Sequence, residues 1–185
     1  MRCPALNELP PAPPGRSGWP WTEESPQISV AMTESQPLPK ISIVTPSYNQ
    51  AQFLEETIRS VLLQGYPNLE YTIIDGGSKD GSVDIIRKYE QWLSYWVSEP
   101  DNGQSDAINK GWSLAKGEIL AWLNSDDTYE INALKTVAAF LTNQDDVDMV
   151  YGDCNIINED SIFEKKCPAI DFDLGSLVCN IWFIS

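Results

Sequence analysis

Asp126 and Asp127 are the residues of this sequence best suited to chemistry. They end the run "AWLNSDD", in which apolar residues give way to an amide, a hydroxyl and two carboxylates. Adjacent carboxylates at the end of a strand can coordinate a hard divalent cation. Serine and aspartate are also common N-caps, so the same residues can simply begin a helix. The residue types alone leave both interpretations open.

The sequence contains no histidine, which excludes the commonest general base, the usual zinc ligand and any nucleophile activated by histidine. Any chemistry must therefore rest on carboxylates. The four cysteines, Cys3, Cys154, Cys167 and Cys179, are widely spaced and form no Cys-x-x-Cys pair. They predict neither a zinc site nor a redox motif, and we interpret them as buried free thiols in a reducing compartment.

The charge balance is strongly acidic, with 12 basic against 27 acidic residues and a formal net charge of −15. This argues against binding to nucleic acid or to anionic lipid. An anionic nucleotide can still bind where backbone N–H groups or a divalent cation offset the charge. The sequence predicts no transmembrane segment and no secretory signal. We expect a cytoplasmic protein, and leave peripheral attachment to a membrane open.

Residues 1–39 differ from the rest of the chain, since they hold nine of the 13 prolines and show no apolar periodicity. This composition predicts a proline-rich disordered tail. Two interpretations stay open. The tail is either a ligand or linker, or an extension that precedes a natural start at Met32.

From residue 41 onward, strand and helix patterns alternate. Short connections between them predict an α/β fold, in which a mainly parallel sheet is flanked by helices on both faces. Trp96, Trp112 and Trp122 fall inside these elements and are predicted to be core residues. The expected strands are 41–46, 69–75, 95–101, 118–124 and 147–157, and the expected helices are 51–65, 83–92, 103–117 and 131–141.

Ligands of such sheets bind beyond the carboxyl ends of the strands, so the residues found there are the candidates for a site. Three of the four ends carry carboxylates, which would repel one another without a cation or hydrogen-bond donors. The turn "DGGSKDGS" fits no P-loop, dinucleotide or EF-hand pattern. The residues at the four ends are Pro46 to Asn49, Asp75 to Ser78, Glu99 to Asp101, and Asn124 to Asp127.

Four segments in order carry a resemblance to a known family. They are "ISIVTPSYNQAQFLEETIRSVLLQGYPNLEYTIIDGGSKDGSVDII", "SEPDNGQSDAINKG", "GEILAWLNSDDTY" and "VYGD". Together they resemble the nucleotide-sugar-binding half of the family 2 glycosyltransferases, which have the Rossmann-like GT-A fold. The resemblance implies a nucleotide-sugar-binding domain over residues 40–158. It also implies an incomplete start of an acceptor-binding region over residues 159–185.

The resemblance also implies roles for single residues. The chain departs from the family at Gly76, where many members have a second aspartate. Three alternatives stay open: Asp106 could equally cap its helix, Asp75 with its two glycines could serve the turn alone, and Tyr48 could be an ordinary residue of the sheet edge. The implied roles are Pro46 and Tyr48 beside the nucleotide base, Asp75 on the base or ribose, Gln104, Asp106 and Asn109 facing the diphosphate, Asp126 on the ribose, and Asp127 as ligand of Mn²⁺ or Mg²⁺.

The implied function is metal-dependent, inverting transfer of a sugar from a UDP- or GDP-linked donor to a glycan or lipid-linked acceptor, as in polysaccharide biosynthesis. No catalytic base is identified. Glu159, Asp160, Asp171 and Asp173 are available but read as solvated loop charges. We therefore expect the base beyond Ser185, in a chain truncated at its C-terminus, and its activity stays open.

Two alternatives remain. One is a non-catalytic remnant that binds a nucleotide or glycan, which an incomplete C-terminal half favours. The other is a sugar nucleotidyltransferase, which would need a glycine-rich loop with basic residues near the first strand, and "TPSYNQAQF" is not such a loop. An uncovered sheet would also expose apolar surface, so we expect self-association.

Overall fold

A computed structural model describes residues 3–28, 38–144 and 146–169 of the chain. The chain divides into two units, residues 1–143 and residues 144–185. Each unit is described by itself. The boundary falls after Asn143, whereas the sequence placed it after Asn158. Met32 and the second half of the predicted acceptor region lie outside the described residues.

The first unit is built on a four-stranded sheet in the order β3-β2-β1-β4. All three pairings are parallel, and Ile41 lies opposite Leu69 on one side and Ile119 on the other. The predicted parallel α/β sheet is therefore confirmed. Its strands are β1 (Ile41–Ser47), β2 (Leu69–Asp75), β3 (Tyr95–Ser98) and β4 (Ile119–Trp122).

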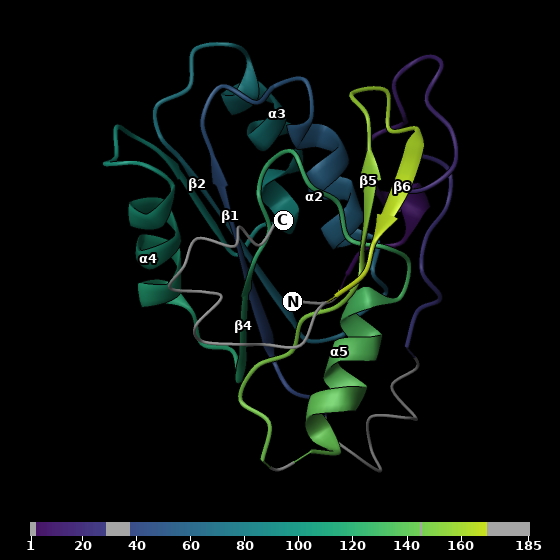
Figure 1. The fold of residues 1–185 in the computed structure, drawn as a ribbon. Coiled ribbons are helices and arrows are strands. Elements are labelled where there is room, and N and C mark those ends of the chain that lie inside the picture. Colours follow the sequence, from purple (N-terminus) through teal and green to yellow (C-terminus); the bar gives the residue numbers. More distant parts are fainter. Residues whose placement is uncertain (1–2, 29–37, 145, 170–185) are drawn as a thin grey trace. The chain divides into compact units, whose positions relative to one another are not determined.

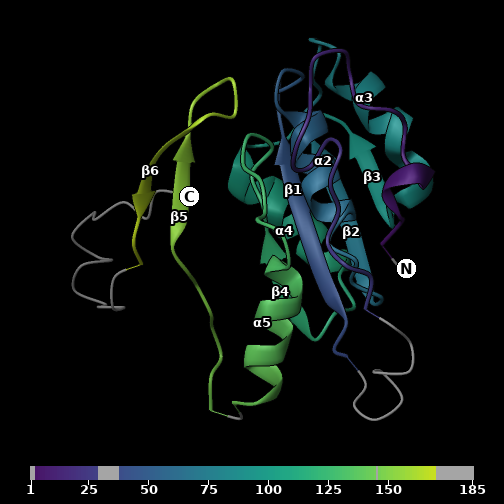
Figure 2. The same cartoon turned by 90° about the vertical axis from the view of Figure 1, so that its right-hand side faces the viewer.

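Helices cover both faces of this sheet, with α4 on one side and α2 and α3 on the other (Figures 1 and 2). Gly111 lets α4 lie directly on the sheet, because a Cβ there would stand 2.5 Å from a methyl carbon of Val44 in β1. The helices of the unit are α2 (Leu54–Leu62), α3 (Ser82–Tyr89), α4 (Gln104–Leu114) and α5 (Ala133–Thr142), with short 3₁₀ turns η1 (Leu6–Glu8) and η2 (Glu90–Trp92).

The alternation of β1 divides the apolar core between the two faces. Ile41 and Ile43 belong to the larger cluster, formed with α2 and α3, while Val44 packs in the smaller cluster with Ala107 of α4. Burial of a side chain of this size stabilises the fold by about 1.5–3 kcal/mol. Trp122 does not share this burial: 49% of it is exposed, since β4 is an edge strand of the described sheet, and its assignment to the core was wrong.

Residues 3–28 belong to the first unit, pack on its core and are not a disordered tail. Cys3, Leu9, Trp21 and Ser25 are buried. Backbone hydrogen bonds join this segment to the end of α2, from Cys3 N–H to the carbonyl of Tyr66 and from Ser25 N–H to that of Leu63. The proline content prevents regular structure, but the apolar side chains between the prolines still fill the core. We call residues 3–28 the N-terminal strap.

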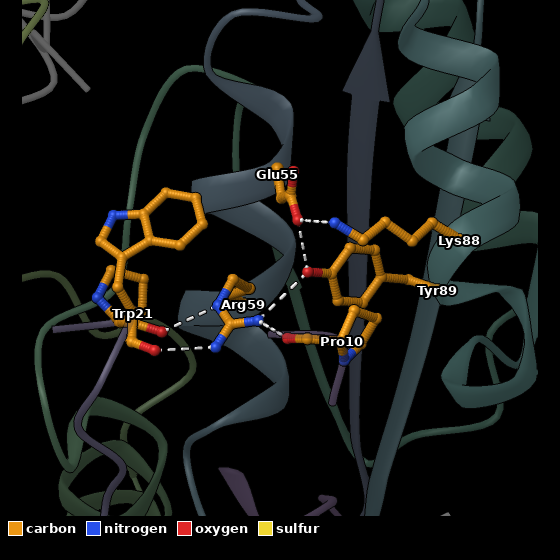
Figure 3. Close-up of polar contacts among 7 residues, drawn as sticks. Pro10, Trp21, Glu55, Arg59, Lys88 and Tyr89 are labelled. Atoms are coloured by element: carbon orange, nitrogen blue, oxygen red, sulfur yellow. Dashed lines mark hydrogen bonds and ion pairs between the residues drawn. The ribbon is translucent and has the colours of Figure 1, made fainter. Parts of the chain in front are cut away.

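A buried arginine of α2 holds the strap (Figure 3). Arg59 is 1% exposed, and its guanidinium donates to the carbonyl oxygens of Pro10, Pro20 and Trp21 at 2.8, 3.0 and 3.0 Å. It also donates to the Tyr89 hydroxyl at 3.2 Å. A buried charge is tolerated only where its N–H groups are paired, and the carbonyl-rich strap provides that pairing.

In the part of the second unit that the structure describes, β5 (Cys154–Ile157) and β6 (Phe163–Cys167) form an antiparallel hairpin. The predicted strand 147–157 is thus shorter than expected, and β6 was not predicted. Cys154 lies directly opposite Cys167, and both are half-buried. The interpretation of the cysteines as buried thiols therefore holds for Cys3 only, and Cys179 lies outside the described residues.

No helix in the described ranges, 3–28, 38–144 and 146–169, is long and apolar enough to cross a membrane.

Candidate functional site

A cleft with a volume of about 600 Å³ opens beyond the carboxyl ends of the parallel strands. The loops that follow β1, β2, β3 and β4 all contribute to it, as the strand-end argument predicted. Its side chains are mostly polar, and none of them is basic. The lining residues are Pro46, Ser47, Tyr48, Gln50, Gly76, Pro100, Asp101, Gly103, Gln104, Ala107, Asn124, Ser125 and Asp126.

Four of the residues predicted for the site line this cleft: Pro46, Tyr48, Gln104 and Asp126. The Tyr48 side chain is 63% exposed, so its ring has a free surface against which a planar base can stack. Gln104 is the first residue of α4, and its amide donates to the side-chain oxygen of Asn124 at 2.5 Å. This bond joins the helix to the segment that carries Asp126.

Asp75 lies beneath the cleft and does not line it. The residue is fully buried, and its carboxylate accepts hydrogen bonds from Gly77 N–H, Ser78 N–H, the Ser78 hydroxyl and the Ser98 hydroxyl. Four internal donors therefore occupy this carboxylate. Asp75 therefore shapes the turn after β2. Its contact with the base or ribose stays a prediction.

Asp106 and Asn109 of α4 also lie outside the cleft lining. Asp106 accepts from the backbone N–H and the side-chain amide of Asn102, at 3.0 and 3.2 Å. Its carboxylate thus fixes the loop that enters the helix, and no side-chain cap hydrogen bond forms at this helix N-terminus. Asn109 is exposed one turn further along.

Asp126 and Asp127 have different surroundings although they are neighbours. Asp126 is exposed in the cleft and lies 3.4 Å from the donating amide of Gln50. Asp127 is half-buried and accepts from the side-chain amide of Asn124 at 3.0 Å. Burial, and then the charge of Asp126, raise the pKa of Asp127 above its usual range. In this geometry Asp126 faces the cleft and Asp127 does not.

The turn "DGGSKDGS" clamps the loop that carries Tyr48 and Gln50. The hydroxyl of Ser78 accepts from Asn49 N–H at 2.7 Å, and the Asp80 carboxylate accepts from Ala51 N–H at 2.8 Å. Asn49 has a left-handed φ of 53°, and its side-chain oxygen accepts in return from Lys79 N–H at 3.0 Å. Asn49 thus bridges two loops, and α2 begins only at Leu54.

Sequence reasoning missed five polar residues of the cleft: Ser47, Gln50, Asp101, Asn124 and Ser125. All of these except Gln50 had been noticed only as strand-end residues, and a count of all polar strand-end residues would have included them. Ser47 is the most informative. It is 4% exposed, and its hydroxyl oxygen has no hydrogen-bond partner among the described residues. A buried hydroxyl without a partner is costly unless a ligand or a water molecule satisfies it.

Comparison with known proteins identifies the family. The profile named Glycosyl transferase family 2 matches residues 42–176. The chain belongs to this family. It is 30% identical over 155 residues to an uncharacterized glycosyltransferase of Nostoc sp., an alignment that covers 77% of this chain and 47% of that protein. The chain thus spans about half the length of this relative.

Solved structures of GT-A glycosyltransferases share the fold. TarS of S. aureus, in complex with UDP-GlcNAc, is 28% identical with a TM-score of 0.52, and the match covers 56% of this chain and 31% of TarS. A mannosyltransferase of Pyrobaculum calidifontis, in complex with GDP-Man and Mn²⁺, has a TM-score of 0.53 over 77% of this chain and 40% of its own. At 22% identity, the second likeness concerns the fold alone.

Proposed function

We propose that the cleft binds the nucleoside diphosphate of a sugar donor, and that the chain is the donor-binding part of a glycosyltransferase. The observation that carries this proposal is the meeting of three different groups in one cleft: the exposed ring of Tyr48, the first turn of α4 at Gln104 and the carboxylate of Asp126. An aromatic ring suits a base, a helix N-terminus suits a phosphate, and a carboxylate suits a cation on that phosphate.

A divalent cation fits the residues present only if the substrate helps to hold it. Among the described residues, no group of three or more acidic or cysteine side chains could hold a metal ion. The cleft offers the carboxylate of Asp126 and the amide oxygen of Asn124. Mg²⁺ and Mn²⁺ are hard cations that accept one or two carboxylates, with phosphate and water as their other ligands. When bound, such a cation neutralises the charge of the departing nucleoside diphosphate.

The side chains of the protein position the donor. Tyr48 packs on the base, Gln50 orients the carboxylate of Asp126, and the first N–H groups of α4 face the phosphates. Because the cleft lining includes no basic side chain, the N–H groups and a cation must together offset the diphosphate charge. This lining also disfavours a nucleotidyltransferase, which handles a triphosphate with basic residues.

The reaction proposed is in-line displacement at the anomeric carbon by an acceptor hydroxyl, with inversion. The acceptor proposed is a glycan or lipid-linked saccharide of polysaccharide biosynthesis, and the compartment is the cytoplasm. Deprotonation of the acceptor needs a base, and we assign none: Glu159 and Asp160 are exposed loop residues, and Asp171 and Asp173 lie outside the described ranges. The second candidate function is binding of the donor without transfer.

Calorimetric titration of UDP and GDP tests the proposal, with and without Mn²⁺, on the wild type and on Asp126→Asn and Asp127→Asn. We expect metal-dependent binding that Asp126→Asn weakens at least tenfold and Asp127→Asn leaves within about threefold. Binding of neither nucleotide by a folded sample would refute the donor site. Equal losses in both variants would refute the assignment of the cleft carboxylate to Asp126.

Release of free sugar or sugar transfer from a bound donor separates the two candidates. Turnover would exclude the purely binding role. Donor binding without turnover, over a panel of saccharide acceptors, would support that role.

A further inference from the structure

Two cysteines face each other across the hairpin of the second unit. Cys154 is the first residue of β5 and Cys167 is the last residue of β6, and the strand register places them directly opposite each other (Figure 1). The register shift of the hairpin lies further along, between Ile156 and Ile157. Directly opposite residues of an antiparallel pair project from the same face of the sheet. Both cysteines are present as thiols and are half-buried, so small reagents can reach them.

The spacing of opposite residues in such a hairpin suits a disulfide bond. Opposite Cα atoms of an antiparallel pair lie about 4.5 or 5.5 Å apart, depending on whether the two residues exchange backbone hydrogen bonds. A disulfide joins residues whose Cα atoms are about 4.4–6.8 Å apart, so both kinds of pair fall within its range. A bond between Cys154 and Cys167 therefore needs only a small approach of the two strands.

Contacts at both ends of the hairpin fix this register. At the turn, Asn158 N–H donates to the carbonyl of Ile162 at 3.0 Å, and the side-chain oxygen of Asn158 accepts from Ile162 N–H at 3.0 Å. At the open end, Asp153 pairs with Lys166 and accepts from Ala169 N–H at 2.8 Å. A slip of one residue would turn one of the two cysteines to the other face, and these contacts oppose such a slip.

We propose that Cys154 and Cys167 form a redox-sensitive site, at which a small disulfide such as oxidised glutathione converts the two thiols into one reversible cross-link. One cysteine thiolate attacks the small disulfide, its S–S bond breaks, a mixed disulfide forms and one small thiol leaves. The second cysteine thiolate attacks the protein sulfur of the mixed disulfide and releases the second small thiol. Two protein thiols thus lose two electrons and two protons, which the two small thiols carry away. The proposal concerns the second unit alone and is independent of the proposed function.

The cross-link would act on the open end of the hairpin. In a reducing compartment the pair stays as thiols, and disulfides that form there are usually transient and redox-sensing. The ion pair of Asp153 with Lys166 at this end is exposed, and exposed ion pairs contribute little to stability. Oxidation therefore adds a covalent constraint beside weak contacts. It should slow the opening of β6, which carries the exposed residues Lys165 and Lys166.

The test follows disulfide formation in mixtures of oxidised and reduced glutathione, after which remaining thiols are alkylated and peptides are mapped by mass spectrometry. Every sample carries Cys179→Ser, because Cys167 and Cys179 fall in one tryptic peptide and Cys154 falls in another. At a given glutathione ratio, we expect at least tenfold more of the cross-linked peptide pair from native chain than from chain in urea. An aromatic disulfide reagent should release about two equivalents of thiolate from the pair and leave no adduct on either cysteine.

Cys154→Ser combined with Asn155→Cys is the matched control. It keeps two thiols at nearly the same separation in the sequence, but Asn155 lies opposite Lys166 and projects from the other face of the hairpin. The native control should form mixed disulfides with glutathione and at least tenfold less cross-link, whereas in urea the two chains should oxidise alike. Oxidation should also slow tryptic cleavage at Lys165 and Lys166 several-fold in the native pair, and it should leave this rate unchanged in the control.

Each other outcome refutes a defined claim. Equal cross-linking in native chain and in urea would show that proximity in the sequence alone joins the cysteines, and this comparison needs no folded control variant. Glutathione or aryl adducts retained on a folded chain would show that the two sulfur atoms do not reach each other. Either result would overturn the site. A cross-link that leaves tryptic cleavage unchanged would refute its effect on the hairpin.

Discussion

Replacing Arg59 with methionine should detach the N-terminal strap from α2. The guanidinium makes three hydrogen bonds to strap carbonyls and lies 5.3 Å from the centre of the Trp21 ring. Methionine keeps an unbranched stem of similar length but carries no N–H group. The carbonyls of Pro10, Pro20 and Trp21 would each lose their donor in a buried or partly buried position (Figure 3).

The expected loss of stability follows from these contacts. Each hydrogen bond from a charged donor contributes about 1.5–3 kcal/mol to the free energy of unfolding. The loss of all three bonds can therefore cost at most about three times that amount. The variant also no longer buries a charge, which offsets part of that loss. Each buried carbonyl left without a donor costs about 1–3 kcal/mol, and after the offset we expect Arg59→Met to lose about 3–5 kcal/mol in total.

Urea denaturation followed by tryptophan fluorescence and circular dichroism measures the change. Limited proteolysis provides a second readout, because a detached strap should be cut within residues 3–28 while the sheet unit stays intact. Arg87→Met is the matched control: the Arg87 side chain is 60% exposed and pairs only at the surface with Asp84, so its loss should cost less than about 1 kcal/mol. A cost below about 1 kcal/mol for Arg59→Met, with an uncut strap, would refute the argument.

Three further predictions concern separate contacts. Gly111→Ala should push α4 off β1 and destabilise the chain by about 1–3 kcal/mol in urea, because its Cβ would meet a β1 side chain at 2.5 Å. Burial raises the pKa of Cys3 to about 12, so in native protein at pH 8 an aromatic disulfide reagent should leave Cys3 unmodified while half-buried Cys154 and Cys167 react. Because the pKa of Asp127 is raised in the folded state, its protonated form stabilises the fold below the ordinary carboxyl pKa. This contribution is lost as the pH rises through the folded-state pKa. Asparagine carries no charge at any pH, so the Tm advantage of Asp127→Asn over the wild type should grow from acid pH to pH 7.

The strand-helix alternation was sufficient to predict the sheet and its helices, since the period of apolar residues reports which face of each element is buried. The same reasoning failed for the N-terminal strap, because its buried residues do not recur at a regular spacing in the sequence. Part of what holds the strap is its carbonyl groups, and these are present in every residue. Three of them accept from the buried guanidinium of Arg59, which the sequence shows as one more helix residue.

The position of the cleft could be predicted because the carboxyl ends of parallel strands share one edge. The sequence could not predict which side chain at the end of each strand faces the ligand, because this depends on the turn that follows the strand. Asp75 is turned inward by four donors from its own turn and from Ser98. Asp127 is turned toward Asn124, while Asp126, one residue earlier, faces the cleft. Spacing in the sequence does not distinguish these directions.

The strap also reaches the site, through the segment that follows Asp127. The indole N–H of Trp19 donates to the carbonyl of Tyr129 at 2.8 Å, and the hydroxyl of Ser25 accepts from Asn132 N–H at 3.0 Å. From the turn that follows α2, the side-chain amide of Gln64 donates to the carbonyl of Glu130 at 3.0 Å. The strap and this turn therefore hold residues 129–132 together, two residues beyond the carboxylate pair.

This arrangement gives the strap a consequence for binding as well as for stability. Once the strap is detached, the segment after Asp127 loses two of these three hydrogen bonds, and the cleft carboxylate of Asp126 is less firmly positioned. Arg59→Met should therefore weaken metal-dependent nucleotide binding under conditions in which the sheet unit is still folded, although Arg59 is not part of the cleft lining. Unchanged affinity in a variant whose strap is cut by protease would show that the turn after α2 alone positions the segment.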